Sequence, residues 1–152
     1  MRIAAVLLCL FALPAAAQET GLVSLQTGDD SRGWNAVGRI DLGLHGFCTG
    51  ALIAPQLVLT AAHCLFDKTT GARIPAEEIK FLAGLRNGRA EAYRGASRAV
   101  AHPDYVYSGA EAIDRVGYDL ALIELDQPIQ QTSITPFSTD VRPPVGANVG
   151  VV

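Results

Sequence analysis

Short stretches in which apolar and more polar residues alternate recur along most of this chain. In residues 34–42 the positions predicted to share one face are Trp34, Ala36, Gly38, Ile40 and Leu42. This period of two is typical of a strand with one buried side. Five further strands are predicted at residues 47–53, 57–60, 79–83, 90–100 and 118–125, and a short helical turn at residues 61–65. Six short strands indicate an antiparallel barrel or a sandwich, and periodicity alone does not choose between them.

The first 17 residues have the pattern of an export signal. Arg2 precedes an apolar run over residues 3–13, and Pro14 is followed by three alanines. This is a signal peptide with a small-residue cleavage site, too short and wrongly flanked for a membrane span; an apolar first strand or helix is the alternative. We predict cleavage before Gln18, a flexible polar arm over residues 18–33, and one domain over residues 34–152, secreted or periplasmic.

The charge balance argues against two classes of partner. The chain has 12 basic and 15 acidic residues and a formal net charge of −3, which loss of Arg2 with the signal peptide makes one unit more negative. A mildly acidic surface without basic clusters gives no reason to expect nucleic acid or an anionic membrane as partner. Apolar residues make up 49% of the chain, so a folded core is expected.

Cysteine usage favours a disulfide. Cys9 leaves with the signal peptide, so Cys48 and Cys64 remain, and in an exported chain they can pair only with each other. The alternative is a zinc site that uses them with His45 or His63. The chain has neither a close-spaced cysteine pair nor a His-x-x-x-His run, so we expect the disulfide and no metal site.

Two segments carry the strongest chemical signal. Residues 47–64 read FCTGALIAPQLVLTAAHC and place His63 beside Cys64 at a strand end, and residues 118–125 read YDLALIEL. The first resembles the histidine-bearing segment of the trypsin/chymotrypsin family of serine proteases (peptidase family S1), and the second resembles its aspartate-bearing segment. Residues 101–105, AHPDY, resemble the loop that commonly precedes that aspartate. The resemblance extends over residues 34–152.

This resemblance implies an all-β fold, the first of two six-stranded antiparallel Greek-key barrels, acting on a protein or peptide substrate. His63 would be the general base that takes the proton of a serine hydroxyl, which is a poor nucleophile without such help. Asp119 would fix the tautomer of the histidine and stabilise the imidazolium. No cofactor is implied, because this chemistry needs none. Structural calcium occurs in the family, but Asp67, Glu77 and Glu78 are too common a set to argue for it.

The other histidines and acids are expected to have no catalytic role. His45 and His102 lie beside loop glycine or proline residues, and Asp104 and Asp114 do not open an apolar strand as Asp119 does. His63 and Asp119 lie farther apart in sequence than the about 45 residues of the family's template. We expect the extra residues in the loops that follow Phe66 and His102.

The nucleophile is not evident. The serines after the predicted cleavage site are Ser24, Ser31, Ser97, Ser108, Ser133 and Ser138. None lies in a Gly-Asp-Ser-Gly-Gly or Gly-x-Ser-x-Gly setting, and in the template the serine follows the aspartate by about ninety residues. We therefore expect this chain to be the N-terminal half of a bacterial secreted protease and to be inactive alone. The missing C-terminal barrel would cover an apolar face that is otherwise exposed. The alternative is a non-catalytic secreted single-barrel binding protein derived from a protease.

Overall fold

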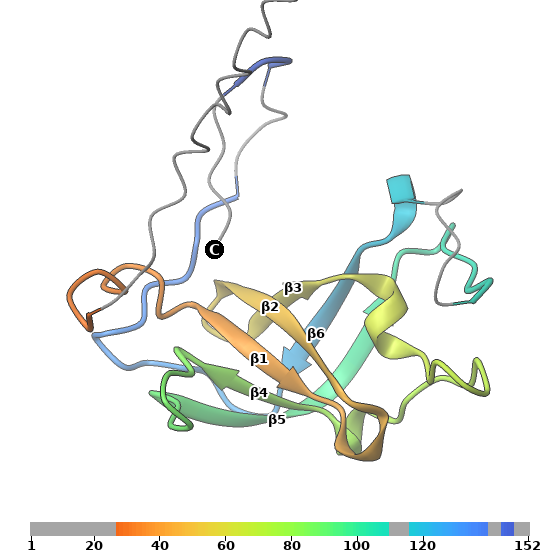
Figure 1. Ribbon diagram of the computed structural model, residues 1–152, viewed down its shortest axis with the longest axis horizontal. Coiled ribbons are helices and arrows are strands. Elements are labelled where there is room, and N and C mark those ends of the chain that lie inside the picture. The colour runs from red at the N-terminus through yellow and green to blue at the C-terminus, as the bar shows by residue number, and fades with distance from the viewer. Residues whose placement is uncertain (1–26, 110–115, 140–143, 148–152) are drawn as a thin grey trace, which may run out of the picture.

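The computed structural model describes residues 27–109, 116–139 and 144–147 (Figure 1). The predicted signal peptide and Asp114 lie outside these residues. The strands are β1 Val37–Asp41, β2 Phe47–Ala54, β3 Leu57–Thr60, β4 Lys80–Ala83, β5 Ala92–Ala101 and β6 Ala121–Leu125. Four short 3-10 turns accompany them: η1 Gly43–His45, η2 Ala62–Leu65, η3 Ala76–Glu78 and η4 Val116–Tyr118. No helix in the described residues is long and apolar enough to cross a membrane.

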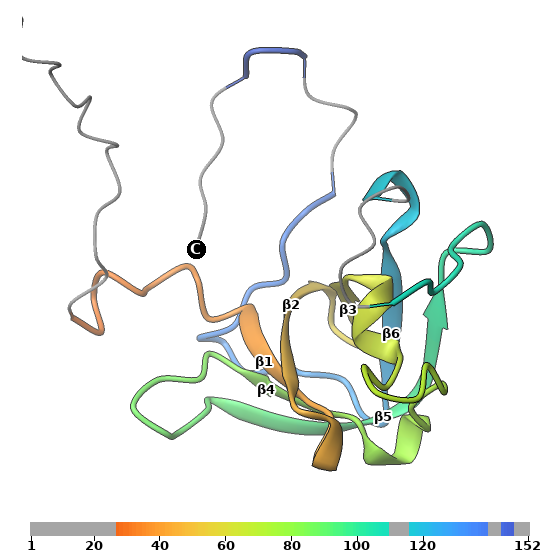
Figure 2. The same ribbon diagram turned by 45° about the vertical axis from the view of Figure 1, so that its right-hand side comes forward.

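The strands form one closed antiparallel barrel in the order β1-β2-β3-β6-β5-β4, with β4 paired back to β1 (Figure 2). The first three strands are sequential neighbours, and β4 returns to lie beside β1, which is the Greek-key arrangement. Closure leaves no free sheet edge that another chain could extend. The prediction of a six-stranded antiparallel barrel is confirmed, and closure decides against the sandwich.

Strands β1 and β6 begin three residues later than the sequence pattern predicts. The backbone N–H of Val37 donates to the carbonyl of Trp34 (2.8 Å), so the chain turns before β1, and the Trp34 ring packs on Phe137 with centroids 5.9 Å apart. In the second case, η4 and a hydrogen bond from Leu120 N–H to the Tyr118 carbonyl (2.7 Å) precede β6. Asp119 therefore lies in the turn before β6 and not within the strand.

Large apolar side chains fill the barrel. The largest fully buried ones come from β1, β2, β3, β4 and β6 and from the segments between them: Ile40, Leu52, Val58, Leu65, Ile79, Phe81, Ile123 and Leu125. Each contributes about 1.5–3 kcal/mol by leaving water. Strands β1 and β4 approach so closely that a Cβ on Gly38 would lie 2.4 Å from the Leu82 carbonyl oxygen. Only glycine fits there without a shift of the backbone.

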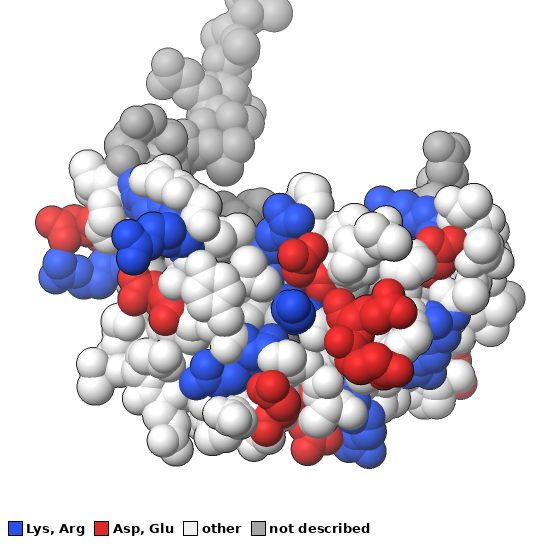
Figure 3. Space-filling model, turned by 90° about the horizontal axis from the view of Figure 1, so that it is seen from below, with Lys and Arg blue, Asp and Glu red and all other residues white. Residues whose placement is uncertain are grey.

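The surface carries both signs of charge. On the face shown in Figure 3, acidic and basic side chains are interspersed rather than segregated. The polar segment before β1 is described from Thr27 onward, where residues 27–33 form turns. Arg86 holds these turns, because its guanidinium donates to the Thr27 carbonyl and to Ser31 Oγ.

Candidate active site

The turn that carries His63 follows directly from β3. Thr60, the last residue of that strand, is buried, and its hydroxyl donates to the Thr49 carbonyl of β2 (2.9 Å). Ala61 is extended, and η2 begins at Ala62, which is fully buried. A small side chain is needed at Ala62 because it lies in the core. The N–H of Phe66 then donates to the His63 carbonyl (3.2 Å) and closes the turn.

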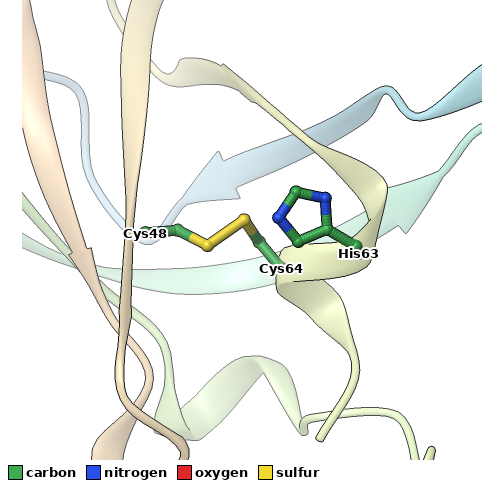
Figure 4. A group of neighbouring side chains, drawn as sticks. All are labelled: Cys48, His63 and Cys64. Atoms are coloured by element: carbon green, nitrogen blue, oxygen red, sulfur yellow. A yellow bond between two sulfur atoms is a disulfide. The ribbon is translucent and has the colours of Figure 1, made fainter. Parts of the chain in front are cut away.

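A disulfide ties this turn to the neighbouring strand. Cys48 of β2 is bonded to Cys64 of η2, and the His63 ring lies beside the bond (Figure 4). The predicted pairing is confirmed. Cys48, His63 and Cys64 place their potential ligand atoms within 4.8 Å of one another. Zinc needs thiolates, however, and here each sulfur is bonded to the other, so only the imidazole could act as a ligand while the bond is intact.

His63 and Asp119 form a two-point contact. The His63 ring Nδ1 lies 2.7 Å from Asp119 Oδ2, and the backbone N–H of His63 donates to Asp119 Oδ1 (2.8 Å). A carboxylate only accepts hydrogen bonds, so the contact assigns the ring proton to Nδ1 and leaves the lone pair on Nε2. The His63 side chain is 46% exposed and that of Asp119 24%. The imidazole is thus open to an incoming group, while the carboxylate is largely covered.

Asp119 is stabilised in its charged form. Burial acts to raise the pKa of its carboxyl, but the hydrogen bonds from the His63 ring and from the His63 backbone outweigh burial and hold the pKa below its usual value. Asp119 is therefore ionised at neutral pH. A negative charge at this position favours the Nδ1-protonated ring and stabilises the imidazolium that forms when Nε2 takes up a second proton.

The remaining histidines have other partners. His45 Nδ1 lies 2.6 Å from Asp67 Oδ2, and its Nε2 lies 3.4 Å from Glu78 Oε2. The ring of His102 stacks on Tyr118, with centroids 5.2 Å apart. The sequence analysis did not foresee the pair of His45 with Asp67, since no local pattern joins a loop acid to a histidine 22 residues away.

Asp67 is fully engaged within its own loop. Its Oδ1 accepts from the backbone N–H of Thr69, and from both the N–H and the hydroxyl of Thr70. Its Oδ2 faces His45. The hydroxyl of Thr70, followed by His45, holds the pKa of Asp67 well below its usual range. Both oxygens of the acid that loop 66–73 would offer to a calcium ion are thus taken up by protein donors.

Three of the described serines donate hydrogen bonds to groups other than His63. Ser97 Oγ donates to the carbonyls of Glu124 and Leu125, and Ser31 Oγ donates to the Gly28 carbonyl. Ser133 Oγ donates to a Glu91 carboxylate oxygen. Within residues 27–109, 116–139 and 144–147, no recorded hydrogen bond joins a serine hydroxyl to His63. The structure thus brings together His63 and Asp119, two of the three residues of the expected catalytic triad.

A family model described as Trypsin matches residues 25–152. The chain belongs to the trypsin family. The match begins before β1 and includes every strand of the barrel, together with His63, Asp119 and the disulfide. Membership in the trypsin family supports a peptidase-like function and a protein or peptide substrate. The disulfide, like the trypsin fold, is typical of proteins from oxidising, extracellular compartments.

Three aromatic residues beside the pair were missed by the sequence analysis. Phe66 stacks on Tyr107, with ring centroids 5.1 Å apart and planes 13° apart, and contacts Tyr105 at 5.8 Å. Phe66 opens one loop of this trypsin-family chain, and the tyrosines lie in the other long loop. Their contact joins segments about forty residues apart in sequence, which a single sequence does not reveal.

Proposed function

We propose that this protein is an exported serine endopeptidase of the trypsin family, in which His63 is the general base and Asp119 the carboxylate that orients it. The observation that carries the proposal is the two-point contact between them. Both carboxylate oxygens of Asp119 are engaged by His63, one by the ring and one by the backbone. Such a contact fixes the plane of the imidazole as well as its tautomer.

The chemistry follows from this geometry. Nε2 of His63 carries a lone pair on a side chain that is 46% exposed, so it can take the proton of a serine hydroxyl as the oxygen attacks a peptide carbonyl. The imidazolium that forms is paired with the charged Asp119. It then gives the proton to the departing amine, which completes acylation and restores the neutral ring.

We further propose that the serine, and the donors that stabilise the oxyanion, come from a second barrel that packs on this one. An apolar groove of about 310 Å³ is formed by residues of β3, β5 and β6 and of the segments beside these strands, and it includes Leu120, the residue after Asp119. Val100, Leu120 and Leu122 in this groove are 46%, 50% and 40% exposed. Contiguous apolar surface of this kind marks a contact site, and its position beside Asp119 suits a partner that completes the catalytic centre.

Export rests on two features. The pattern of Arg2, an apolar run and three alanines before Gln18 is that of a signal peptide. The disulfide between Cys48 and Cys64 would persist only outside a reducing cytosol. Both features support the proposed secreted or periplasmic location.

The test compares peptide cleavage by the chain ending at Val152 with cleavage by the complete product of its reading frame. We expect no hydrolysis by the former. In the latter, Asp119→Asn should lower kcat by about 10⁴-fold, and His63→Ala should lower it by about 10⁶-fold. The matched control is His45→Gln, which removes a histidine paired with a different acid and should leave cleavage unchanged. Hydrolysis that survives His63→Ala would refute the proposal.

A further inference from the structure

The members of the catalytic pair come from two segments that need to be held together. His63 lies in the turn after β3, and Asp119 lies in the turn before β6. The strands themselves pair in register, with Thr60 opposite Ala121. The disulfide ties the His63 turn to β2 and not to the Asp119 segment. Any further restraint on the pair has to come from the loops around it.

The aromatic cluster of Phe66, Tyr105 and Tyr107 supplies such a restraint. Phe66 directly follows η2, and its N–H donates to the His63 carbonyl (3.2 Å). Its ring contacts both tyrosine rings. The tyrosine segment is thereby attached to the His63 turn through the residue whose backbone closes that turn.

The same tyrosine segment is also attached to the strand of Asp119. The N–H of Tyr105 donates to the His102 carbonyl (2.9 Å), and the N–H of His102 donates to the carbonyl of Leu120 (2.8 Å). Leu120 is the residue after Asp119. Tyr105 is therefore connected to the His63 turn through a ring contact with Phe66 and to the Asp119 segment through backbone hydrogen bonds.

We propose that Tyr105 is a positioning residue for the His63–Asp119 pair, held in place by its contact with Phe66, which Tyr107 stabilises by stacking. Its half-buried ring excludes water from the region of Asp119 and so strengthens the hydrogen bond to His63 Nδ1. Its role in catalysis rests on the proposed function; its effect on the geometry of the pair does not.

The electrostatics of Tyr105 agree with this placement. Burial raises the pKa of its hydroxyl, and the negative charge of Asp119 raises it further. The Tyr105 phenol therefore stays neutral, so it adds no negative charge that would compete with the Asp119 carboxylate.

The experiment uses the purified chain labelled with ¹⁵N-histidine, which contains three histidines. The ring ¹⁵N shifts report the tautomer of each, and His45→Gln and His102→Gln assign the signals. We expect Tyr105→Leu to mix the tautomers of His63 and to speed exchange of its Nδ1 proton with water roughly tenfold. Tyr105→Phe keeps the ring and should retain the wild-type His63 signals.

The His45–Asp67 pair is a reference within the same molecule. Its Nδ1–carboxylate distance of 2.6 Å resembles that of the catalytic pair, and Asp67 directly follows Phe66. General loosening of loop 66–73 would disturb both pairs, whereas loss of positioning disturbs His63 alone. Trp34→Leu, which removes a separate aromatic contact, controls for lowered stability and should leave His63 unchanged.

Two results would overturn the proposal. One is an unchanged His63 tautomer and exchange rate in folded Tyr105→Leu; the other is an equal disturbance of His45. If Tyr105→Leu does not fold, Tyr107→Leu must give the selective effect on His63, because it weakens the support of the same ring through Phe66. None of these readouts requires peptide cleavage, so failure of the proposed function would not affect them.

Discussion

The Cys48–Cys64 bond offers the sharpest test of how this barrel is stabilised. The two residues are 16 positions apart. In the chain-entropy model, closing a loop of this size lowers the entropy of the unfolded chain by about 10 cal/mol/K, which corresponds to about 3 kcal/mol at 25 °C. Reduction of the bond should therefore lower the free energy of unfolding by about 3 kcal/mol without removing any atom from the core.

Urea unfolding of the oxidised and the reduced chain, followed by tryptophan fluorescence of Trp34, measures this difference. The free energy of unfolding should fall more steeply with urea concentration for the reduced chain, because its unfolded state is more expanded. Cys48→Ala combined with Cys64→Ala should cost at least as much as reduction, because Cys64 is buried and its sulfur is then lost. A loss below about 1 kcal/mol on reduction would show that the bond does not restrain the unfolded chain as this reasoning requires.

Three further perturbations test the packing and the electrostatics. Gly38→Ala should destabilise the barrel by about 1–3 kcal/mol, because its Cβ would meet the Leu82 carbonyl. Gly28→Ala is the control and should change stability little, because nothing lies within 4 Å of a Cβ at that position. Equal losses of stability in denaturant unfolding would contradict the close approach of β1 and β4. Tyr107→Phe should raise the free energy of unfolding by about 1 kcal/mol, because the Tyr107 hydroxyl is buried with no hydrogen-bond partner among the described residues. Tyr93→Phe should lower the free energy of unfolding, because it loses the hydrogen bond from Ala90 N–H. A change of the same sign in both variants would argue against this explanation. The pKa of Asp119 is lower in the folded chain than in the unfolded one, so its contribution to stability is complete above the unfolded value of about 3.9 and is lost as the pH falls through the folded value. The stability advantage of the wild type over Asp119→Asn should accordingly shrink on acidification in urea titrations, and an advantage that grows would have the wrong sign.

Alternation of apolar residues was sufficient to predict the barrel strands, because one face of each strand fills the interior. It failed at the ends of strands, where the same residues pack differently. Trp34 and Ala36 continue the alternating pattern, yet a turn precedes β1 and Trp34 contacts Phe137 instead of a strand neighbour. Tyr118 likewise belongs to η4 and stacks on His102. Trp34 and Tyr118 are exposed, at 37% and 47%, so the alternating pattern continues past the strand ends at residues that fill no part of the barrel interior.

Cysteine usage predicted the bond between Cys48 and Cys64, and motifs directed attention to His63 and Asp119. They could not give the two-point contact, which depends on the turn that precedes β6. Nor could they give the contact of Phe66 with Tyr105 and Tyr107, because this contact depends on how two long loops meet. Such contacts are set by tertiary packing, which leaves no local signal in one sequence.

We propose that His63 activates a serine supplied by a second barrel. The most direct measurement is covalent labelling of the complete gene product with a fluorophosphonate, which reacts only with an activated serine, followed by mass spectrometry of the labelled peptide. We expect one labelled serine, encoded after Val152, and loss of labelling in His63→Ala but not in His45→Gln. A folded complete product that carries no label, or a label that persists in His63→Ala, would contradict it.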